Sequence, residues 1–143
     1  AEKINDIVKI VPTIYYFSYS YNSVENDNKG NLSPENIDFR FLKSTSNLML
    51  RNDRKIGKHT IGNDGLVDVT SAMYPKDEPF KFYNKDEKIN SGIWNVMPLR
   101  KGDHGTPIGL FSDTETTHRF YDELMNMLSS IEQDNWINYS YMI

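Results

Sequence analysis

Two short apolar segments, separated by a long polar stretch, constrain the fold of this chain more than any other feature of its sequence. Residues 13–21, with the sequence TIYYFSYSY, are aromatic and β-branched and contain neither glycine nor proline. Residues 93–99 form a second apolar run, and Pro98 marks its expected end. Because such runs are typical of strands that are buried in a sheet, we expect one buried strand in each segment.

Apolar residues recur at helical spacing near both ends of the chain. Residues 1–11 carry such a pattern and Pro12 stops it, which predicts a short N-terminal helix. Near the other end, Ser112 and Glu115 have the spacing of a capping box. Four apolar residues then follow on one helical face, Phe120, Leu124, Leu128 and Ile131. We expect a helix over residues 114–131 and an aromatic tail that packs against other residues.

The rest of the chain is polar and rich in residues that favour turns. Residues 22–62 are expected to form a surface excursion with one short helix, and residues 76–92 a charged, mobile loop. Between them, Asn63-Asp64-Gly65 predicts a turn that leads into a short extended segment. Residues 100–109 place glycines and a proline around one histidine and predict a loop. We expect a single domain over residues 1–143.

Composition excludes several classes of function. The chain has 143 residues, 16 Lys and Arg against 20 Asp and Glu, a formal net charge of -4 and no cysteine. This balance disfavours nucleic acid as a partner, because phosphate binding needs a basic excess. Without cysteine there is no disulfide, no thiolate nucleophile and no cysteine-ligated metal. No apolar run is long enough for a transmembrane segment. Because the chain starts at Ala1 without a leader, we expect it to be processed or excised.

His104 is the histidine whose setting favours a functional role. It follows Asp103, has Gly105 after it, and comes just past the end of a predicted strand, where open α/β sheets place their ligands. His59 lies in a lysine-rich loop and His118 on the polar side of the predicted C-terminal helix, so both are expected to be solvated. A single loop histidine is more often structural than catalytic, and His104 alone therefore decides nothing.

Asp64 changes the interpretation of His104. The Asn63-Asp64-Gly65 segment is a common turn, but a carboxylate in one loop followed by a histidine in the next has the chain order of the α/β-hydrolase triad. In that chemistry the carboxylate orients the imidazole, which takes the proton from an attacking serine. The serine itself is missing, because no G-x-S-x-G pattern occurs in the sequence. Ser71, Ser91 and Ser112 lack the paired glycines of a nucleophile elbow.

Four blocks of sequence carry a resemblance to a known family. Residues 1–20, 63–75 and 92–109, with the closing amphipathic helix, resemble the C-terminal part of secreted bacterial triacylglycerol lipases of the staphylococcal and thermophilic-bacillus type. The poorly matching part is residues 22–55. The resemblance implies an α/β fold, namely the C-terminal portion of an α/β-hydrolase with the last strands of its parallel sheet, the triad loops and the closing C-terminal helix. It also implies that Asp64 and His104 are the triad aspartate and histidine, and that the protein is secreted.

The same resemblance bears on metals. The family's serine elbow, lid and zinc ligands lie upstream of the position that Ala1 resembles, so none is expected in this chain. The family's calcium ligands follow the triad histidine by two and seven positions, where this sequence has Thr106 and Phe111. One nearby carboxylate, Asp113, makes a poor cage for an ion that prefers six to eight oxygen ligands. We therefore expect no cofactor in this chain.

Three hypotheses about function follow. The leading one is the C-terminal part of a secreted lipase, which supplies the acid and base of the triad, is inactive without a serine-bearing segment, and acts on lipid or acyl esters when completed. The alternative is a non-catalytic, lipase-derived remnant that serves as an interaction module. A third, weaker hypothesis is an unrelated α+β binding protein. Since the last strands of a parallel sheet expose apolar edges, we expect this chain to cover them as a homo-oligomer, in a complex with the rest of the lipase, or by rearranging its strands.

Overall fold

The computed structural model describes residues 9–110 and 113–140, with the side chains of residues 132–140 excepted. The chain divides into two compact units, Ala1–His104 and Gly105–Ile143. The single domain expected over residues 1–143 stays a prediction. Most of the N-terminal helix expected over residues 1–11 lies outside the described residues. Residues 9–11 are not helical.

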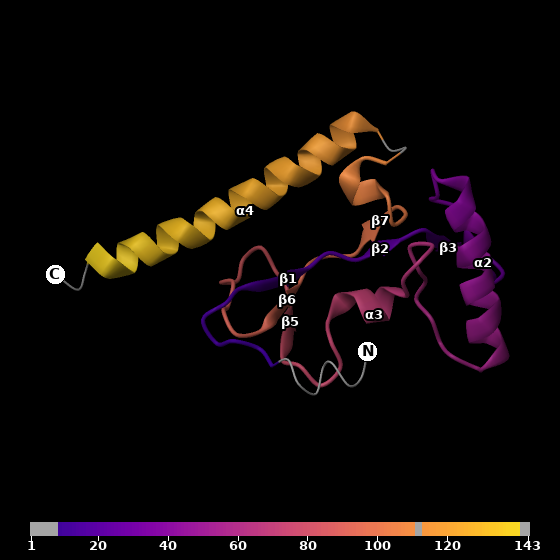
Figure 1. Cartoon of the computed structure of the whole chain (residues 1–143), viewed down its shortest axis with the longest axis horizontal. Coiled ribbons are helices and arrows are strands. Elements are labelled where there is room, and N and C mark those ends of the chain that lie inside the picture. Colours follow the sequence, from indigo (N-terminus) through magenta and orange to yellow (C-terminus); the bar gives the residue numbers. More distant parts are fainter. Residues whose placement is uncertain (1–8, 111–112, 141–143) are drawn as a thin grey trace. The chain divides into compact units, whose positions relative to one another are not determined.

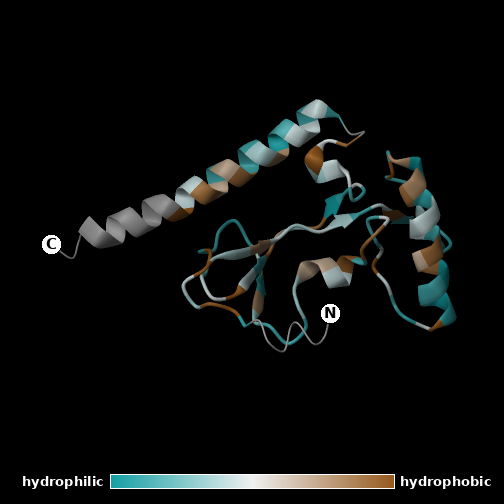
Figure 2. Ribbon diagram, in the orientation of Figure 1, coloured by the Kyte–Doolittle hydropathy of each residue, from teal (hydrophilic) through white to brown (hydrophobic). Residues whose placement is uncertain are grey.

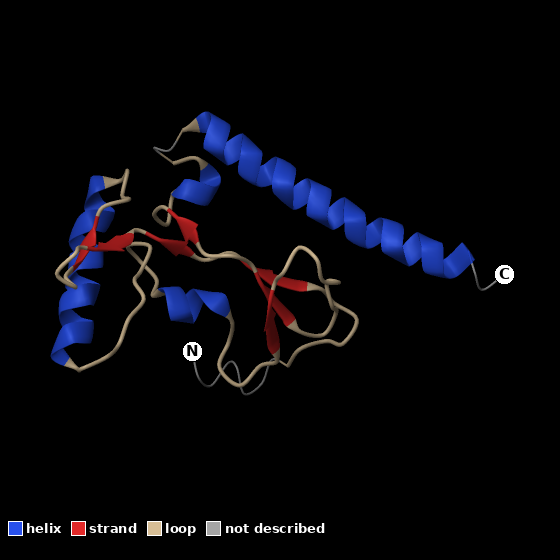
Figure 3. Cartoon of the chain, turned by 180° about the vertical axis from the view of Figure 1, so that it is seen from behind, coloured by secondary structure: helices blue, strands red, loops and turns tan. Residues whose placement is uncertain are grey.

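The first unit contains a parallel three-stranded sheet (Figure 1). Its strands are β1 (Tyr16–Ser18), β6 (Trp94–Val96) and β5 (Phe80–Phe82), in the order β1-β6-β5. Trp94 is the Cα partner of both Tyr16 and Phe80. Both strands expected from the sequence contribute to this sheet, and its parallel pairing confirms the α/β character. Viewed from behind, the three strands lie side by side (Figure 3).

Strand β5 corrects one sequence prediction. Residues 76–92 are not only a charged loop, because Phe80–Phe82 pair with β6. The backbone N–H of Trp94 donates to the Pro79 carbonyl at 2.9 Å, and that of Tyr83 donates to the Val96 carbonyl at 2.8 Å. The strand has only three residues between charged neighbours, so its apolar pattern is too short to stand out from the surrounding polarity.

Each of the two predicted strands continues into a second, shorter one. Residues Tyr21–Asn22 form β2 and Arg100–Lys101 form β7, and these two strands also pair in parallel. The N–H of Arg100 donates to the Ser20 carbonyl at 3.0 Å, and that of Gly102 to the Asn22 carbonyl at 3.1 Å. The loop predicted over residues 100–109 therefore begins with a strand that fixes its first residues.

The polar excursion of residues 22–62 is more ordered than its composition suggests. It forms an antiparallel hairpin of β3 (Val24–Asn26) and β4 (Leu32–Pro34), followed by the 16-residue helix α2 (Arg40–Lys55). The prediction of one short helix is thus wrong in length. The buried face of α2 consists of Leu42, Ser46, Leu50 and Asp53. Half of this face is polar, and α2 shows mixed colours in Figure 2, so its polar composition hid the helix from a prediction based on apolar residues.

Helix α3 (Val69–Met73) replaces the extended segment expected after the Asn63-Asp64-Gly65 turn. Asp68 precedes the helix, and its carboxylate accepts a hydrogen bond from the N–H of Thr70 at 2.9 Å. Such an N-cap outweighs the alternation of Val67 and Val69, which suggested a strand. Val69 is completely buried.

The second unit contains the short 3₁₀ helix η1 (Thr106–Ile108) and the long helix α4 (Thr114–Ser140). The predicted C-terminal helix is confirmed, and it continues past residue 131. The predicted cap Ser112 lies outside the described residues. Asp113 caps the helix, because its carboxylate accepts from the N–H groups of Glu115 at 3.2 Å and Thr116 at 2.9 Å. The packing expected of the aromatic tail lies outside the described side chains.

Small polar residues make up much of the interior of the first unit. Residues that are at most 2% exposed include Ser20, Ser23, Ser46, Asn63, Asn95 and Asp103. Asn95 donates to the Tyr16 carbonyl at 3.0 Å and to the Asn90 carbonyl at 2.9 Å. The Asn95 side chain therefore ties β1 and the loop before β6 together through the backbone, in addition to apolar packing. No described helix is both long and apolar enough to cross a membrane.

Candidate functional site: a carboxylate–imidazole pair

The turn that carries Asp64 is built around its own side chains. Asp64 Oδ1 accepts hydrogen bonds from the N–H groups of Leu66 at 2.9 Å and Val67 at 2.7 Å. The N–H of Asp64 donates to the Val67 carbonyl at 3.1 Å. Gly65 has a φ of 99°, which a residue with a side chain rarely adopts. The turn therefore fixes the direction of the Asp64 carboxylate.

Asn63 attaches this turn to the rest of the first unit. Its carbonyl oxygen accepts from the N–H of Ser23 at 2.9 Å and from the Ser23 hydroxyl at 2.8 Å. Its side-chain oxygen accepts from the N–H of Gly65 at 3.0 Å. Helix α2 contacts the same turn, because the Thr45 hydroxyl donates to the Gly65 carbonyl. The position of Asp64 is thus set by contacts with two separate segments.

His104 lies against Asp64 through both its backbone and its ring. The N–H of His104 donates to the Asp64 carbonyl at 2.8 Å. Its ring Nδ1 lies 2.8 Å from Asp64 Oδ2. The side chain of Asp64 is 10% exposed and that of His104 is 51% exposed. The structure therefore brings together the two residues that the sequence selected, with a buried carboxylate facing a half-exposed imidazole.

The two oxygens of Asp64 have different partners. Oδ1 accepts from backbone N–H groups, and Oδ2 faces the imidazole. A carboxylate at Nδ1 favours the tautomer that carries its proton on Nδ1, which leaves Nε2 as a base. Within the described residues, Nε2 of His104 has no hydrogen-bond partner. This arrangement is chemically able to accept a proton from a hydroxyl group.

An ion-pair network lies next to the Asp64 turn. Lys58 Nζ is 2.9 Å from Asp68 Oδ2, and the Thr60 hydroxyl donates to the same oxygen at 3.1 Å. Burial raises the pKa of the Asp68 carboxyl, but the hydrogen bond and charge of Lys58, with Thr60 and the Thr70 N–H, outweigh it and leave the pKa below 3.8. The hydrogen bond to Asp68 raises the pKa of Lys58 above 10.5. This network was not predicted from the sequence, where the one signal at Asp68 is that aspartate is a residue type favoured at helix N-caps.

The other histidines lie in different surroundings. His59 is exposed and lines an open pocket of about 290 Å³, together with Arg54, Lys58 and Thr60. His118 is exposed on α4. Both have the solvent-exposed positions expected of them. Of the serines considered as nucleophiles, Ser71 is exposed in α3 and Ser91 is exposed in a loop, while Ser112 lies outside the described residues.

The positions of the family's calcium ligands do not fit a calcium ion. Thr106 is buried in η1, and Phe111 lies outside the described residues. The nearby carboxylate of Asp113 already accepts two backbone N–H groups and the Thr116 hydroxyl. Within the described residues there is no group of three or more His, Asp or Glu side chains that could hold a metal ion. The expectation that this chain binds no cofactor stays a prediction.

Comparisons with known proteins agree with the resemblance noted in the sequence. The family described as "Lipase-like, C-terminal domain" matches residues 1–138. This chain therefore belongs to the lipase-like C-terminal domain family. The third hypothesis, an unrelated α+β protein, is thereby excluded.

Individual lipases are similar to this chain over nearly all of its length. The lipase of Staphylococcus hyicus is 30% identical over 139 residues, which cover 92% of this chain and 20% of that protein. Lipase 2 of Staphylococcus aureus is 30% identical over 137 residues, which cover 91% of this chain and 19% of that protein. The chain thus spans about a fifth of the length of these lipases.

Solved structures give the same result. The crystal structure of the Staphylococcus hyicus lipase superposes with a TM-score of 0.79 at 28% identity, over 93% of this chain and 35% of that chain. The structure of EstA from Clostridium botulinum superposes with a TM-score of 0.69 at 27% identity, over 84% of this chain and 30% of that chain. The fold of this chain is therefore that of the corresponding region of lipases and esterases.

Proposed function

We propose that this chain supplies the acid and the base of a Ser-Asp-His triad in a secreted lipase that cleaves carboxylic esters. The observation that carries the proposal is the 2.8 Å contact between Asp64 Oδ2 and His104 Nδ1, with the imidazole half exposed. His104 Nε2 would accept the proton of an attacking serine and later return it to the leaving alcohol. Asp64 would hold the ring in the required tautomer and stabilise the imidazolium.

The serine would come from polypeptide outside these 143 residues. Two observations support this part of the proposal. The sequence contains no G-x-S-x-G pattern, and the chain corresponds to about a fifth of the related lipases. On this view the chain alone hydrolyses no ester, and its lipid or triacylglycerol substrate is bound only when the serine-bearing segment is present.

The test is to complete the enzyme. The region of the Staphylococcus hyicus lipase that matches this chain is replaced by the present chain, and hydrolysis of p-nitrophenyl butyrate is measured. We call this protein the completed enzyme. The matched controls are the 143-residue chain alone, the unaltered Staphylococcus hyicus lipase, and the completed enzyme with His104→Ala.

We expect the completed enzyme to cleave the ester only when His104 is present, and the chain alone to be inactive. Folding of the completed enzyme is checked by circular dichroism and by its unfolding transition. A folded completed enzyme that is inactive with the native His104 would favour the alternative hypothesis, a non-catalytic remnant. Activity of the chain alone would contradict the assignment of the serine to another segment.

Self-association stays a prediction that one further measurement tests. Phe80 and Phe82 of strand β5 are both exposed within the first unit. Exposed aromatic residues on a short strand favour association with another apolar surface. Sedimentation of the chain at several concentrations is expected to show a dimer or larger species, and a monomer throughout would contradict it.

A further inference from the structure

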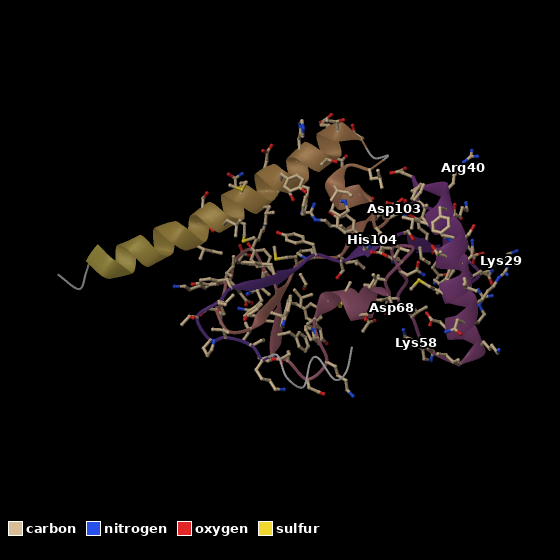
Figure 4. The ribbon with its side chains drawn as sticks, viewed as in Figure 1. Lys29, Arg40, Lys58, Asp68, Asp103 and His104 are labelled. Atoms are coloured by element: carbon tan, nitrogen blue, oxygen red, sulfur yellow. The ribbon has the colours of Figure 1, made fainter. Side chains whose placement is uncertain are left out.

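Asp103, the residue before His104, is a fully buried carboxylate that the proposed chemistry does not use. Its exposed fraction is 0%. It follows strand β7 and Gly102, whose N–H donates to the Asn22 carbonyl at 3.1 Å. In Figure 4 its label lies beside that of His104. A buried charge is costly unless hydrogen bonds satisfy it, so the partners of Asp103 indicate what it does.

Two partners of Asp103 lie at the start of helix α2. Asp103 Oδ2 accepts from the N–H of Asp38 at 2.9 Å and from the N–H of Phe39 at 3.0 Å. Phe39 is the N-cap residue of α2, and its own side chain makes no capping hydrogen bond. The first N–H groups of a helix have no acceptor within the helix, and a carboxylate is a strong acceptor for backbone N–H groups. Asp103 therefore fastens the His104 loop to the beginning of α2.

The same helix also contacts the turn that carries Asp64. Thr45, in the second turn of α2, donates its hydroxyl to the Gly65 carbonyl. A Cβ placed on Gly65 would lie 2.7 Å from the Leu42 Cβ, so α2 and this turn are packed closely. The residue before His104 is thus bonded to the start of helix α2, and the residue after Asp64 is bonded to its second turn.

We propose that Asp103 is a positioning residue, which sets the place of His104 relative to Asp64 through its two hydrogen bonds to the start of α2. The inference rests on the proposed function for its catalytic consequence, but its structural part stands independently. Loss of the Asp103 carboxylate releases the His104 loop from α2 and lengthens the contact between Asp64 Oδ2 and His104 Nδ1. A small misplacement of a catalytic group is enough to slow a reaction by about 10²-fold.

The test compares Asp103→Ala with a matched control, Asp27→Ala. Asp27 Oδ1 also accepts two backbone N–H groups, from Lys29 and Asn31, each at 2.8 Å. It lies in the β3–β4 turn, and Figure 4 shows Lys29 of that turn away from His104. The first readout is the ring Nδ1–H proton resonance of His104 in the 143-residue chain, which reports the bond to Asp64 without any ester. The second is the separate kcat and KM of the completed enzyme.

We expect Asp103→Ala to lose the His104 resonance and to lower kcat about 10- to 100-fold, with KM within about twofold of its original value. Asp27→Ala should change neither readout. Asp103→Asn keeps a weaker, uncharged acceptor, so its kcat should lie between those of the native protein and Asp103→Ala. If Asp103→Ala does not fold, Asp103→Asn decides the question.

Three results would overturn the proposal: a native resonance in folded Asp103→Ala, an equal loss in Asp27→Ala, or native kcat in Asp103→Asn. The backbone N–H groups of Asp38 and Phe39 must also exchange slowly with solvent in the native chain, and free exchange would contradict the hydrogen bonds themselves. If the native completed enzyme is inactive while the resonance still depends on Asp103, the proposed function fails and the positioning role remains.

Discussion

The loops that carry His104 and His59 look alike in sequence but differ in how firmly the structure holds them. Both are polar segments with a single histidine. The His104 loop is bonded to the Asp64 carbonyl through its backbone and to the start of α2 through Asp103. In the His59 loop, Lys58 forms the ion pair with Asp68, while His59 itself is exposed at an open pocket. The buried Asp64 carboxylate that faces its ring is therefore what distinguishes the setting of His104 from that of the solvated His59.

The largest expected effect on kcat comes from substituting the two histidines of these loops. His104→Ala should lower kcat of the completed enzyme by about 10⁴- to 10⁶-fold, because the general base is lost. His59→Ala should leave kcat within about twofold, since its ring faces solvent. Ester hydrolysis by both variants, at equal concentrations of folded protein, checks this. Equal losses of kcat in the two variants would show that the different surroundings of His104 and His59 do not affect catalysis.

A second, slightly smaller effect is expected at the carboxylate. Asp64→Asn keeps the shape of the side chain but presents an amide to the imidazole, which favours the wrong tautomer. The expected loss in kcat is about 10⁴-fold at neutral pH. The same assay measures it, with Asp68→Asn as the control carboxylate in the neighbouring network. A loss in Asp68→Asn that matches the loss in Asp64→Asn would count against a specific role of Asp64.

A third effect concerns the stability of the Asp64 turn. Gly65→Ala introduces a side chain at a φ of 99° and within 2.7 Å of the Leu42 Cβ. We expect the free energy of unfolding to fall by about 2–4 kcal/mol, from backbone strain and crowding together. Gly57→Ala is the matched control, because its φ is 68° and nothing lies within 4 Å of the added Cβ. Its cost should be only about 1–2 kcal/mol.

Urea unfolding of the two glycine variants gives these values. Since Gly65 follows Asp64 directly, Gly65→Ala should also reduce kcat of the completed enzyme, whereas Gly57→Ala should not. Equal destabilisation by the two substitutions would mean that the close approach of Leu42 to the turn has no energetic consequence.

The smallest effect is the pH dependence of the Lys58–Asp68 pair. Asp68 has its pKa lowered below 3.8 in the folded chain, so the unfolded chain binds the proton more readily. The stabilisation is therefore complete well above the ordinary pKa of an aspartate and is lost as the pH falls through the lower pKa of the folded state. Lys58 is 43% exposed, so solvent screening limits the contribution to about 1 kcal/mol or less.

Urea unfolding of the native chain and of Asp68→Asn, from pH 6 down to pH 2.5, checks this prediction. The difference in stability between the two proteins should be constant at the upper end and shrink at the lower end. A difference that grows as the pH falls would have the wrong sign for a carboxyl group whose pKa is lowered by folding.

Asp64 and His104 could be predicted from the sequence because an aspartate and a histidine, each in a loop, have recognisable surroundings. Asp64 and His104 each follow a turn or glycine signal, and their order matches a known chemical arrangement. The amphipathic pattern of α4 was also sufficient to predict that helix. Each of these signals lies within the short segment whose structure it predicts.

The rest could not be predicted because it depends on contacts between distant segments. The hydrogen bonds from Asp38 and Phe39 to Asp103 join residues more than 60 positions apart, and neither Asp38 nor Phe39 carries a side-chain signal for them. The buried face of helix α2 includes two polar residues, Ser46 and Asp53, and the helix is polar overall, so its composition suggested a surface excursion. Strand β5 has three residues and pairs with β6, which is distant in the chain, so its own sequence carries little signal for it.

Asp64 is expected to fix the tautomer of His104, and the ¹⁵N chemical shifts of the imidazole rings at neutral pH measure this. We predict that His104 carries its proton on Nδ1, that Nε2 is unprotonated, and that Asp64→Asn abolishes this preference. His59 and His118, in the same spectrum, should show the averaged shifts of solvated rings. If His104 gives the same averaged shifts as these two histidines in the native chain, the Asp64 carboxylate does not orient the imidazole and its proposed role is wrong.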